Sequence, residues 1–191
     1  MRVYPAKKPR ATFVLAHGAG AGSSSDWIVR YAKALASRGV RVVTFDFPKT
    51  RSKMDPLEEA YVAIVEKTRA RFPKEPLSIG GKSMGGRVAS LIAAKYTLPI
   101  ARLVFFGYPL HPPGKPEKRR DAHLPDVKQP MLFVCGTRDP FGSEREVRSL
   151  TKKLGAELLV IEGGDHSLIV PKRAPNPDER IWDAAAAFIA Q

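Results

Sequence analysis

The feature that most constrains the fold of this chain is a regular alternation of short apolar runs with longer segments of helical periodicity. The runs lack the polar–apolar alternation of a half-exposed strand, which indicates strands buried on both faces. Strands of this kind that alternate with helices are typical of a parallel sheet covered on both sides. We therefore predict an α/β fold, mostly parallel, with about six strands, at residues 11–16, 40–45, 77–80, 103–106, 131–135 and 158–161.

Local signals place the helices between these strands. Ser143 and Glu146 have the spacing of a capping box, and Asp55 followed by Pro56 predicts a capped helix start. The predicted helices cover 26–38, a segment from 55, 83–96, a segment from 143 and 178–190. No internal repeat or linker interrupts the pattern, and 191 residues suit one core. We expect a single domain over residues 1–191 with no large cap domain.

Composition narrows the class of protein. With 43% hydrophobic and 27% charged residues, the chain has ordinary globular usage. Its one cysteine, Cys135, lies in an apolar run, which predicts a buried side chain and excludes an intrachain disulfide. No apolar stretch is long enough for a membrane span or a signal-peptide core. These observations predict a cytoplasmic protein that does not associate with membranes.

The formal net charge of +13 suggests affinity for anionic partners. However, the basic residues are scattered, and no aromatic-interleaved basic stretch or nucleic-acid motif is present. We therefore expect no specific binding of nucleic acid. We interpret the positive charge as a surface property that keeps the protein soluble and weakly attracts acidic partners.

The segment Gly81-Lys82-Ser83-Met84-Gly85 carries the strongest chemical signal. It follows a predicted strand and precedes a predicted amphipathic helix, the context in which G-x-S-x-G forms a nucleophile elbow. Small residues are needed there because the serine backbone is strained and its neighbours crowd the strand and the helix. A glycine-rich turn with a capping serine is the alternative, and the strand–turn–helix context favours a nucleophile.

A nucleophilic serine needs a base, and the base needs an orienting acid. In the α/β arrangement these partners follow the serine in the order acid, then histidine. Asp139 and His166 fit this order, because each follows a predicted strand. A turn aspartate before proline and a solvated loop histidine are the structural alternatives. Asp165 is adjacent to His166, but a sequence neighbour usually points elsewhere, so Asp139 is the better orienting acid.

The segment His17-Gly18-Ala19-Gly20 suits an oxyanion-binding loop, because glycines let the backbone approach a substrate. We expect the N–H groups of Ala19 and Met84 to bind the oxyanion. Two nucleotide-binding patterns fail: a P-loop needs glycine where Pro76 stands, and a dinucleotide fingerprint needs it at Ser23. No cofactor and no metal are predicted.

The chain resembles small α/β-hydrolases of the dienelactone-hydrolase-like group. More closely it resembles the branch with bacterial predicted hydrolases, testis-expressed hydrolase-like proteins and a subunit of the NSL chromatin complex. The resemblance runs from His17 through Gly81–Arg87 and the Tyr-Pro-Leu-His-Pro segment at 108–112 to Asp165-His166-Ser167. It implies a catalytic assignment of Ser83, Asp139 and His166. Dienelactone hydrolases proper have a cysteine where Ser83 stands, so a dienelactone substrate is not supported.

The expected function is hydrolysis of a small carboxylic ester or thioester through an acyl-enzyme on Ser83, with a small acyl compound as the partner. The proline-rich segment 108–130 is expected to form only a short lid, whose basic residues would favour anionic substrates or simply be solvated. The alternative is a non-catalytic interaction or scaffold protein that uses its basic surface, as the resemblance allows for some relatives. An acyltransferase with the same three residues is a weaker third reading.

Overall fold

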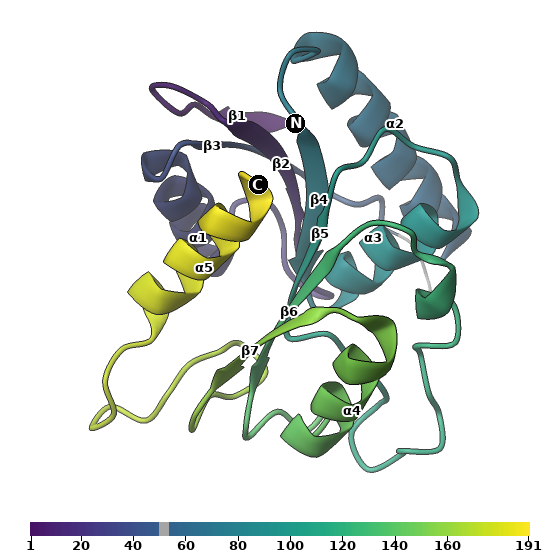
Figure 1. The fold of residues 1–191 in the computed structure, drawn as a ribbon, viewed down its shortest axis with the longest axis vertical. Helices are drawn as coiled ribbons and strands as arrows, with labels where there is room; N and C mark the ends of the chain where they lie inside the picture. The colour runs from purple at the N-terminus through teal and green to yellow at the C-terminus, as the bar shows by residue number, and fades with distance from the viewer. Residues whose placement is uncertain (50–53) are drawn as a thin grey trace.

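The computed structural model describes residues 1–49 and 54–191, which form one seven-stranded sheet and five α-helices (Figure 1). The strand order is β1-β3-β2-β4-β5-β6-β7, and each neighbouring pair is parallel except β1 with β3. The strands are β1 (Arg2–Tyr4), β2 (Ala11–Ala16), β3 (Val40–Phe45), β4 (Leu77–Lys82), β5 (Leu103–Phe106), β6 (Met131–Gly136) and β7 (Glu157–Ile161). The helices are α1 (Asp26–Ser37), α2 (Asp55–Arg71), α3 (Met84–Lys95), α4 (Glu144–Leu154) and α5 (Asp178–Ile189).

The predicted α/β fold is confirmed, and the six predicted strands are the six parallel strands of the sheet. The additional strand, β1, pairs antiparallel with β3 at the edge, where Val3 lies opposite Val43. The sequence does not predict β1 because three residues are too few to show a periodic pattern.

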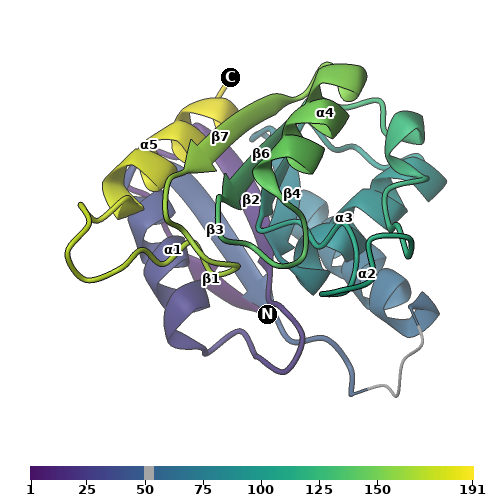
Figure 2. The ribbon, with the colours of Figure 1, turned by 90° about the horizontal axis from the view of Figure 1, so that it is seen from below.

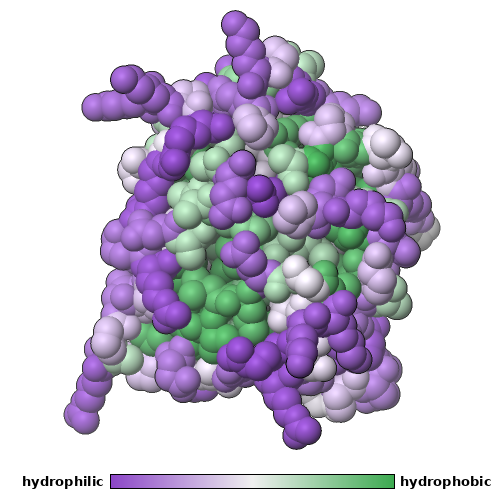
Figure 3. Space-filling view, viewed as in Figure 1, coloured by the Kyte–Doolittle hydropathy of each residue, from purple (hydrophilic) through white to green (hydrophobic). Residues whose placement is uncertain are grey.

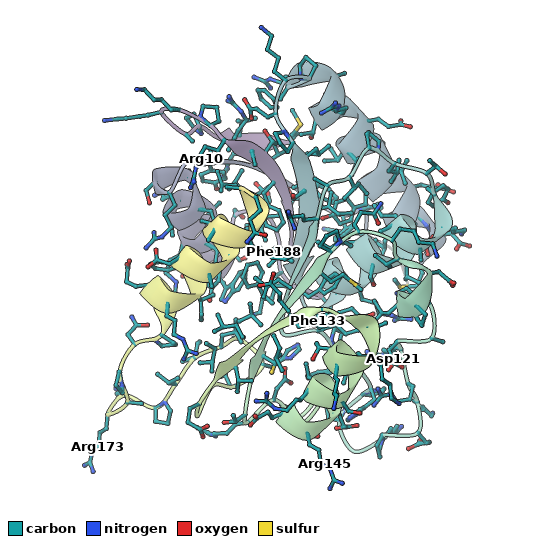
Figure 4. All side chains as sticks on the ribbon, viewed as in Figure 1. Arg10, Asp121, Phe133, Arg145, Arg173 and Phe188 are labelled. Atoms are coloured by element: carbon teal, nitrogen blue, oxygen red, sulfur yellow. The ribbon has the colours of Figure 1, made fainter. Side chains whose placement is uncertain are left out.

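The helices cover both faces of the sheet. Figures 1 and 2 show α1 and α5 on one face and α2, α3 and α4 on the other. Each face has its own apolar core. Phe133 points from β6 into one core, and Phe188 from α5 packs in the other (Figure 4). Because the central strands are buried on both faces, their sequences lack polar alternation.

The helix-start predictions had different outcomes. The capping box of α4 is present, with the Ser143 hydroxyl accepting from the Glu146 N–H and the Glu146 carboxylate accepting from the Ser143 N–H. The prediction that Asp55 caps α2 is wrong, because Met54 is the N-cap residue and Asp55 is the first helical residue. Asp55 in the first turn still favours the helix through its charge near the positive end of the dipole.

Most of the surface on one side of the molecule is hydrophilic, with an apolar area between α5 and β7 (Figure 3). There α5 packs on β5 and β6, so Leu159 of β7 stays only half-buried. In the part of the chain that the structure describes, no helix combines the length and the apolar character needed to cross a membrane.

Candidate active site

Four of the predicted polar segments follow β2, β4, β6 and β7, and they meet at the carboxyl edge of the sheet. Parallel strands end at the same edge, which is where ligands bind in folds of this kind. The site opens into a cavity of about 920 Å³ lined by residues of several loops and helices, including His17, Ala19, Ser83, Met84 and His166.

Ser83 occupies a strained backbone conformation between β4 and α3, with φ +49° and ψ −115°. A non-glycine residue with positive φ costs about 1–3 kcal/mol, which surrounding structure must offset. The Ser83 N–H donates to the Phe106 carbonyl at 3.0 Å. A Cβ at Gly81 would lie 2.5 Å from the Ala16 carbonyl oxygen, and one at Gly85 would lie 2.6 Å from it. The glycines therefore let the turn approach β2 closely enough to hold Ser83 in place.

Ser83, His166 and Asp139 form a continuous chain of hydrogen bonds. His166 Nε2 lies 2.8 Å from Ser83 Oγ, and its Nδ1 lies 2.9 and 2.8 Å from the two Asp139 oxygens. Because an ionised carboxylate only accepts, Nδ1 carries the proton, and Nε2 of the neutral ring accepts from the Ser83 hydroxyl. This is the arrangement in which a histidine can remove the proton of an attacking hydroxyl.

The imidazole is held by contacts on both sides. Asp139 is buried and also accepts from the Phe141 N–H at 2.9 Å. The Phe141 ring stacks on the His166 ring with centroids 4.1 Å apart. A Cβ at Gly107 would lie 2.6 Å from the His166 carbonyl oxygen, so glycine is needed where β5 ends. The ring therefore has little freedom to leave the line between Ser83 and Asp139.

The alternative acid, Asp165, has a different role. One of its oxygens accepts from the N–H groups of Ser167 and Ile169 at 2.7 and 3.0 Å. Leu168 in this turn has a φ of +65°. Asp165 thus stabilises the tight turn that presents His166, and its carboxylate is directed toward the backbone.

His17 anchors the glycine loop after β2. Its Nδ1 lies 2.8 Å from the Gly18 carbonyl, and its Nε2 accepts from the Phe47 N–H at 3.1 Å. Both nitrogens of this buried ring are engaged, so His17 ties the loop to the end of β3. A Cβ at Gly18 would lie 3.6 Å from the Cβ of Ser83, which places the loop beside the serine.

Ala19 and Met84 both line the cavity next to Ser83. Within residues 1–49 and 54–191, the N–H of neither residue donates a hydrogen bond. Met84 begins α3, where backbone N–H groups carry the positive end of the helix dipole. The site therefore presents backbone donors beside a hydroxyl and an imidazole, a set suited to acyl transfer.

The sequence interpretation missed several basic and aromatic neighbours of the serine. Lys82 Nζ donates to Ser167 Oγ at 2.7 Å and lies 5.4 Å from the centroid of the Trp27 ring. Trp27 Nε1 donates to the Ser167 carbonyl at 3.1 Å. Burial lowers the pKa of the Lys82 ammonium group. Arg87 and Arg120 also line the cavity. No local signal reveals these contacts, because they join residues 85 and 140 positions apart.

In the described residues, no three His, Cys, Asp or Glu side chains gather closely enough to hold a metal ion. The polar groups around Ser83 are instead hydroxyl, imidazole, backbone N–H and cationic side chains.

Comparison with known proteins decides the family. Residues 9–191 match the model of a family described as an alpha/beta hydrolase domain. The chain belongs to this family. As an α/β-hydrolase it is compact: in its described residues, the region from 107 to 130 where a cap would be inserted contains only a short 3₁₀ turn, Leu124–Asp126.

Several solved structures share the fold over nearly the whole chain. Est1E from Butyrivibrio proteoclasticus with ferulic acid bound superposes with a TM-score of 0.79 at 16% identity, covering 98% of this chain and 92% of that one. An α/β serine hydrolase without a lid from Xanthomonas campestris gives 0.73 at 20% identity, covering 98% and 84%. A dienelactone hydrolase from Anabaena variabilis gives 0.74 at 18% identity, covering 97% and 88%. These likenesses establish the fold.

Proposed function

We propose that this α/β-hydrolase is a serine hydrolase that cleaves a small carboxylic ester or thioester through an acyl-enzyme on Ser83. The observation that carries the proposal is the unbroken chain Ser83 Oγ–His166–Asp139 at the wall of the cavity. In this assignment His166 is the general base and then the general acid, and Asp139 holds its tautomer.

In the first half-reaction, Ser83 Oγ attacks the acyl carbon while His166 Nε2 takes the hydroxyl proton. The carbonyl π electrons move to oxygen, and a tetrahedral oxyanion forms. When the oxyanion collapses, the bond to the leaving oxygen or sulfur breaks. The imidazolium donates its proton to that atom, so the alcohol or thiol leaves neutral and the acyl group stays on Ser83.

In the second half-reaction, water takes the place of the alcohol or thiol. His166 removes one proton from the water as its oxygen attacks the acyl-enzyme, and the second oxyanion collapses with cleavage of the bond to Ser83 Oγ. The proton returns to Ser83, and the carboxylic acid is released. Charge builds on the carbonyl oxygen in both halves. The N–H groups of Ala19 and Met84 are assigned to bind it, and each oxyanion donor is worth about 3–4 kcal/mol in enzymes of this type.

The chemistry of the site and a relative in fold both support a carboxylic ester as the substrate. A thiolate nucleophile is not available at the elbow, because serine stands where dienelactone hydrolases proper have cysteine. Est1E, a relative in fold, was solved with a carboxylic acid, ferulic acid, bound. A carboxylic ester is the simplest substrate consistent with both. We also propose that the chain lies nearest the testis-expressed and NSL-subunit branch, on the motifs quoted above.

A second candidate function is a non-catalytic interaction protein. It is favoured by the net charge of +13 and by the exposed arginines that extend into solvent, such as Arg145 and Arg173 (Figure 4). A non-catalytic protein does not need a serine, a histidine and a carboxylate joined by hydrogen bonds. We therefore place this function second.

The experiment that tests the proposed hydrolase uses a fluorophosphonate probe and p-nitrophenyl esters of graded acyl length. We expect the wild type to be labelled and to hydrolyse the short esters, and Ser83→Ala to abolish both. Ser149→Ala removes an exposed serine of α4 and is the matched control, which should be labelled as the wild type is. A wild type that is folded by circular dichroism yet neither labelled nor active would overturn the proposal.

A further inference from the structure

We propose that the substrate of this site carries an anionic group, a carboxylate or phosphate, which Arg87 and Arg120 bind. The inference rests on the proposed function, because it assigns the substrate class of the same cavity.

The charges that line the cavity are of one sign. Four basic residues face it, and among the described residues that line it there is no aspartate or glutamate. The four are Lys49, Lys82, Arg87 and Arg120. The positions of two of them are explained without a ligand. Lys82 donates a hydrogen bond to Ser167, and the side chain of Lys49 is exposed to solvent. The two arginines have no comparable explanation.

Arg87 lies one helical turn beyond the serine, and its N–H donates to the Ser83 carbonyl at 3.1 Å. Its side chain is half-buried, and its Nε is buried without a hydrogen-bond partner among the described residues. No ion pair joins Arg87 to a described carboxylate, and residues 50–53, Thr-Arg-Ser-Lys, contain no acid. Burial, and then the nearby Arg120, lower the pKa of Arg87. A buried donor without an acceptor is costly, and an anion would supply one.

Arg120 is held in place by its backbone. Its N–H donates to the Leu110 carbonyl at 2.8 Å, and its carbonyl accepts from the Tyr108 hydroxyl at 3.0 Å. Tyr108 is buried, so this part of the segment is pinned against the core. The backbone of Arg120 is therefore fixed at the cavity that Arg87 also lines, although their like charges repel.

Two acidic residues in this part of the protein, Asp121 and Glu58, are paired with other cations. Asp121 pairs with Arg119, and Glu58 accepts from Lys95 at 3.1 Å. The other groups that face Arg87 are the His123 imidazole, which bonds Ser90 and whose pKa is lowered chiefly by burial, and the Tyr108 hydroxyl. Glu58 attracts Arg87 only from beyond ion-pair distance, and neither Glu58 nor Asp121 forms an ion pair with Arg87 or Arg120. Planar guanidinium groups match the geometry of carboxylate and phosphate, so a substrate anion is the ligand that fits.

The position of the arginines indicates how far the anion lies from the reacting carbon. One turn of helix spans about 5.4 Å, so Arg87 is close to the serine along the axis of α3. An acyl chain with a few methylene groups between the carbonyl and a terminal carboxylate would reach it. The same anion carried by the leaving alcohol would reach it from the other side of the ester bond.

The test compares matched pairs of esters in which one member carries an additional carboxylate. On the acyl side the pair is p-nitrophenyl valerate and the mono-p-nitrophenyl ester of glutaric acid. On the alcohol side it is phenyl acetate and 4-acetoxybenzoate. For the wild type we expect kcat/KM to be about tenfold higher for the anionic member of one pair, as for one charge-assisted bond. The pair that shows the preference identifies the side that carries the anion.

Substitutions of the two arginines then show which residues cause the preference for the anionic ester. Arg87→Gln and Arg120→Gln should each reduce the anionic-to-neutral ratio, Arg87→Lys should retain part of it, and inorganic phosphate should inhibit the wild type competitively. Lys74→Gln removes an exposed charge in the turn before β4, at the opposite edge of the sheet, and should keep the wild-type ratio. Labelling by the fluorophosphonate probe shows that each variant is folded with an intact Ser83.

The outcomes separate this inference from the proposed function. If all four esters are hydrolysed in a Ser83-dependent way and the two members of each pair have equal kcat/KM, the anion site is overturned and the hydrolase remains. The same holds if Arg87→Gln and Lys74→Gln lower the ratio equally. If no ester is cleaved and Ser83 is not labelled, the hydrolase itself fails.

Discussion

At the scale of single residues, the proposed chemistry depends on a serine held in a conformation that serine rarely adopts. The strain at Ser83 persists because glycines on both sides allow β2, β4 and α3 to close around it. A side chain at Gly80 would lie 1.9 Å from the Val104 carbonyl oxygen, so even the end of β4 tolerates only hydrogen there. The turn at Ser83 is thus specified by glycines, because side chains at their positions would collide with the surrounding backbone.

Asp139→Asn tests whether the carboxylate holds the histidine in its reactive tautomer. The amide can donate to Nδ1, which would move the ring proton to Nε2 and leave no acceptor for the Ser83 hydroxyl. We expect kcat/KM for a short p-nitrophenyl ester to fall about a thousandfold or more, with circular dichroism unchanged. Asp26→Asn, at an exposed site on α1, is the control. A loss of less than about tenfold would mean that Asp139 does not orient His166 during turnover.

At the scale of elements, helix α4 connects the lid segment to the sheet. Its capping residue Glu146 accepts from the Ser143 N–H and hydroxyl at 2.9 and 2.7 Å, and it also pairs with Arg119 at 3.0 Å. The start of the helix and the proline-rich segment are therefore held by the same carboxylate. Gly155, with a φ of +62°, ends α4 in the left-handed conformation that glycine favours.

The pH dependence of the free energy of unfolding measures how much the Glu146 carboxylate stabilises the N-terminal cap of α4. Hydrogen bonds from Ser143 lower the pKa of Glu146 from 4.5 to about 2. A carboxyl whose folded pKa is depressed contributes stability above its unfolded pKa and loses it as the pH falls through the folded value. Glu146→Gln should therefore lower the free energy of unfolding most above about pH 5, and the difference from wild type should shrink between about pH 4.5 and 2. Urea unfolding at a series of pH values measures it.

Ser149→Ala on the same helix serves as the control for that series, because Ser149 is exposed. Its difference from wild type should not change with pH. A Glu146→Gln difference that is constant from pH 7 to 2 would show that the ionised carboxylate does not stabilise the cap.

At the scale of the whole molecule, two cores on either side of one sheet must form together. Cys135 lies on β6, next to the edge strand β7, and it is buried, as its apolar run predicts. Burial raises the pKa of its thiol to about 12, so the reactive thiolate is scarce at neutral pH. Only opening of the sheet exposes it.

Thiol reactivity therefore measures global unfolding of this protein. We expect the native protein not to react with a dithiobis-nitrobenzoate reagent over hours at pH 7.5, and one thiol to react in denaturing urea. The midpoint of thiol exposure should coincide with the midpoint followed by circular dichroism, as for a cooperative domain. Rapid reaction of the native protein would show that β6 opens locally.

The sequence predicts the order of the elements and the identity of the residues that meet around Ser83. Apolar runs without alternation predict β2 to β7, and the helical periods predict α1 to α5, because burial on two faces or on one stripe imposes a local pattern. The prediction fails for β1, which has three residues, and for the cap of α2, where Met54 replaces Asp55. β1 is defined by its pairing with β3, and the start of α2 by the conformation of one turn. Neither produces a repeating pattern of apolar residues in the sequence.

By itself, then, the sequence determined the α/β architecture and the serine, the acid and the histidine in their required order. Only the tertiary structure decided the distances among them and the gathering of Arg87 and Arg120 at one cavity. The physical reason is the range of the interactions. Apolar periodicity is a local property that can be read along each helix or strand. Arg87 and Arg120, in contrast, line one cavity only when α3 and the proline-rich segment pack against the same sheet.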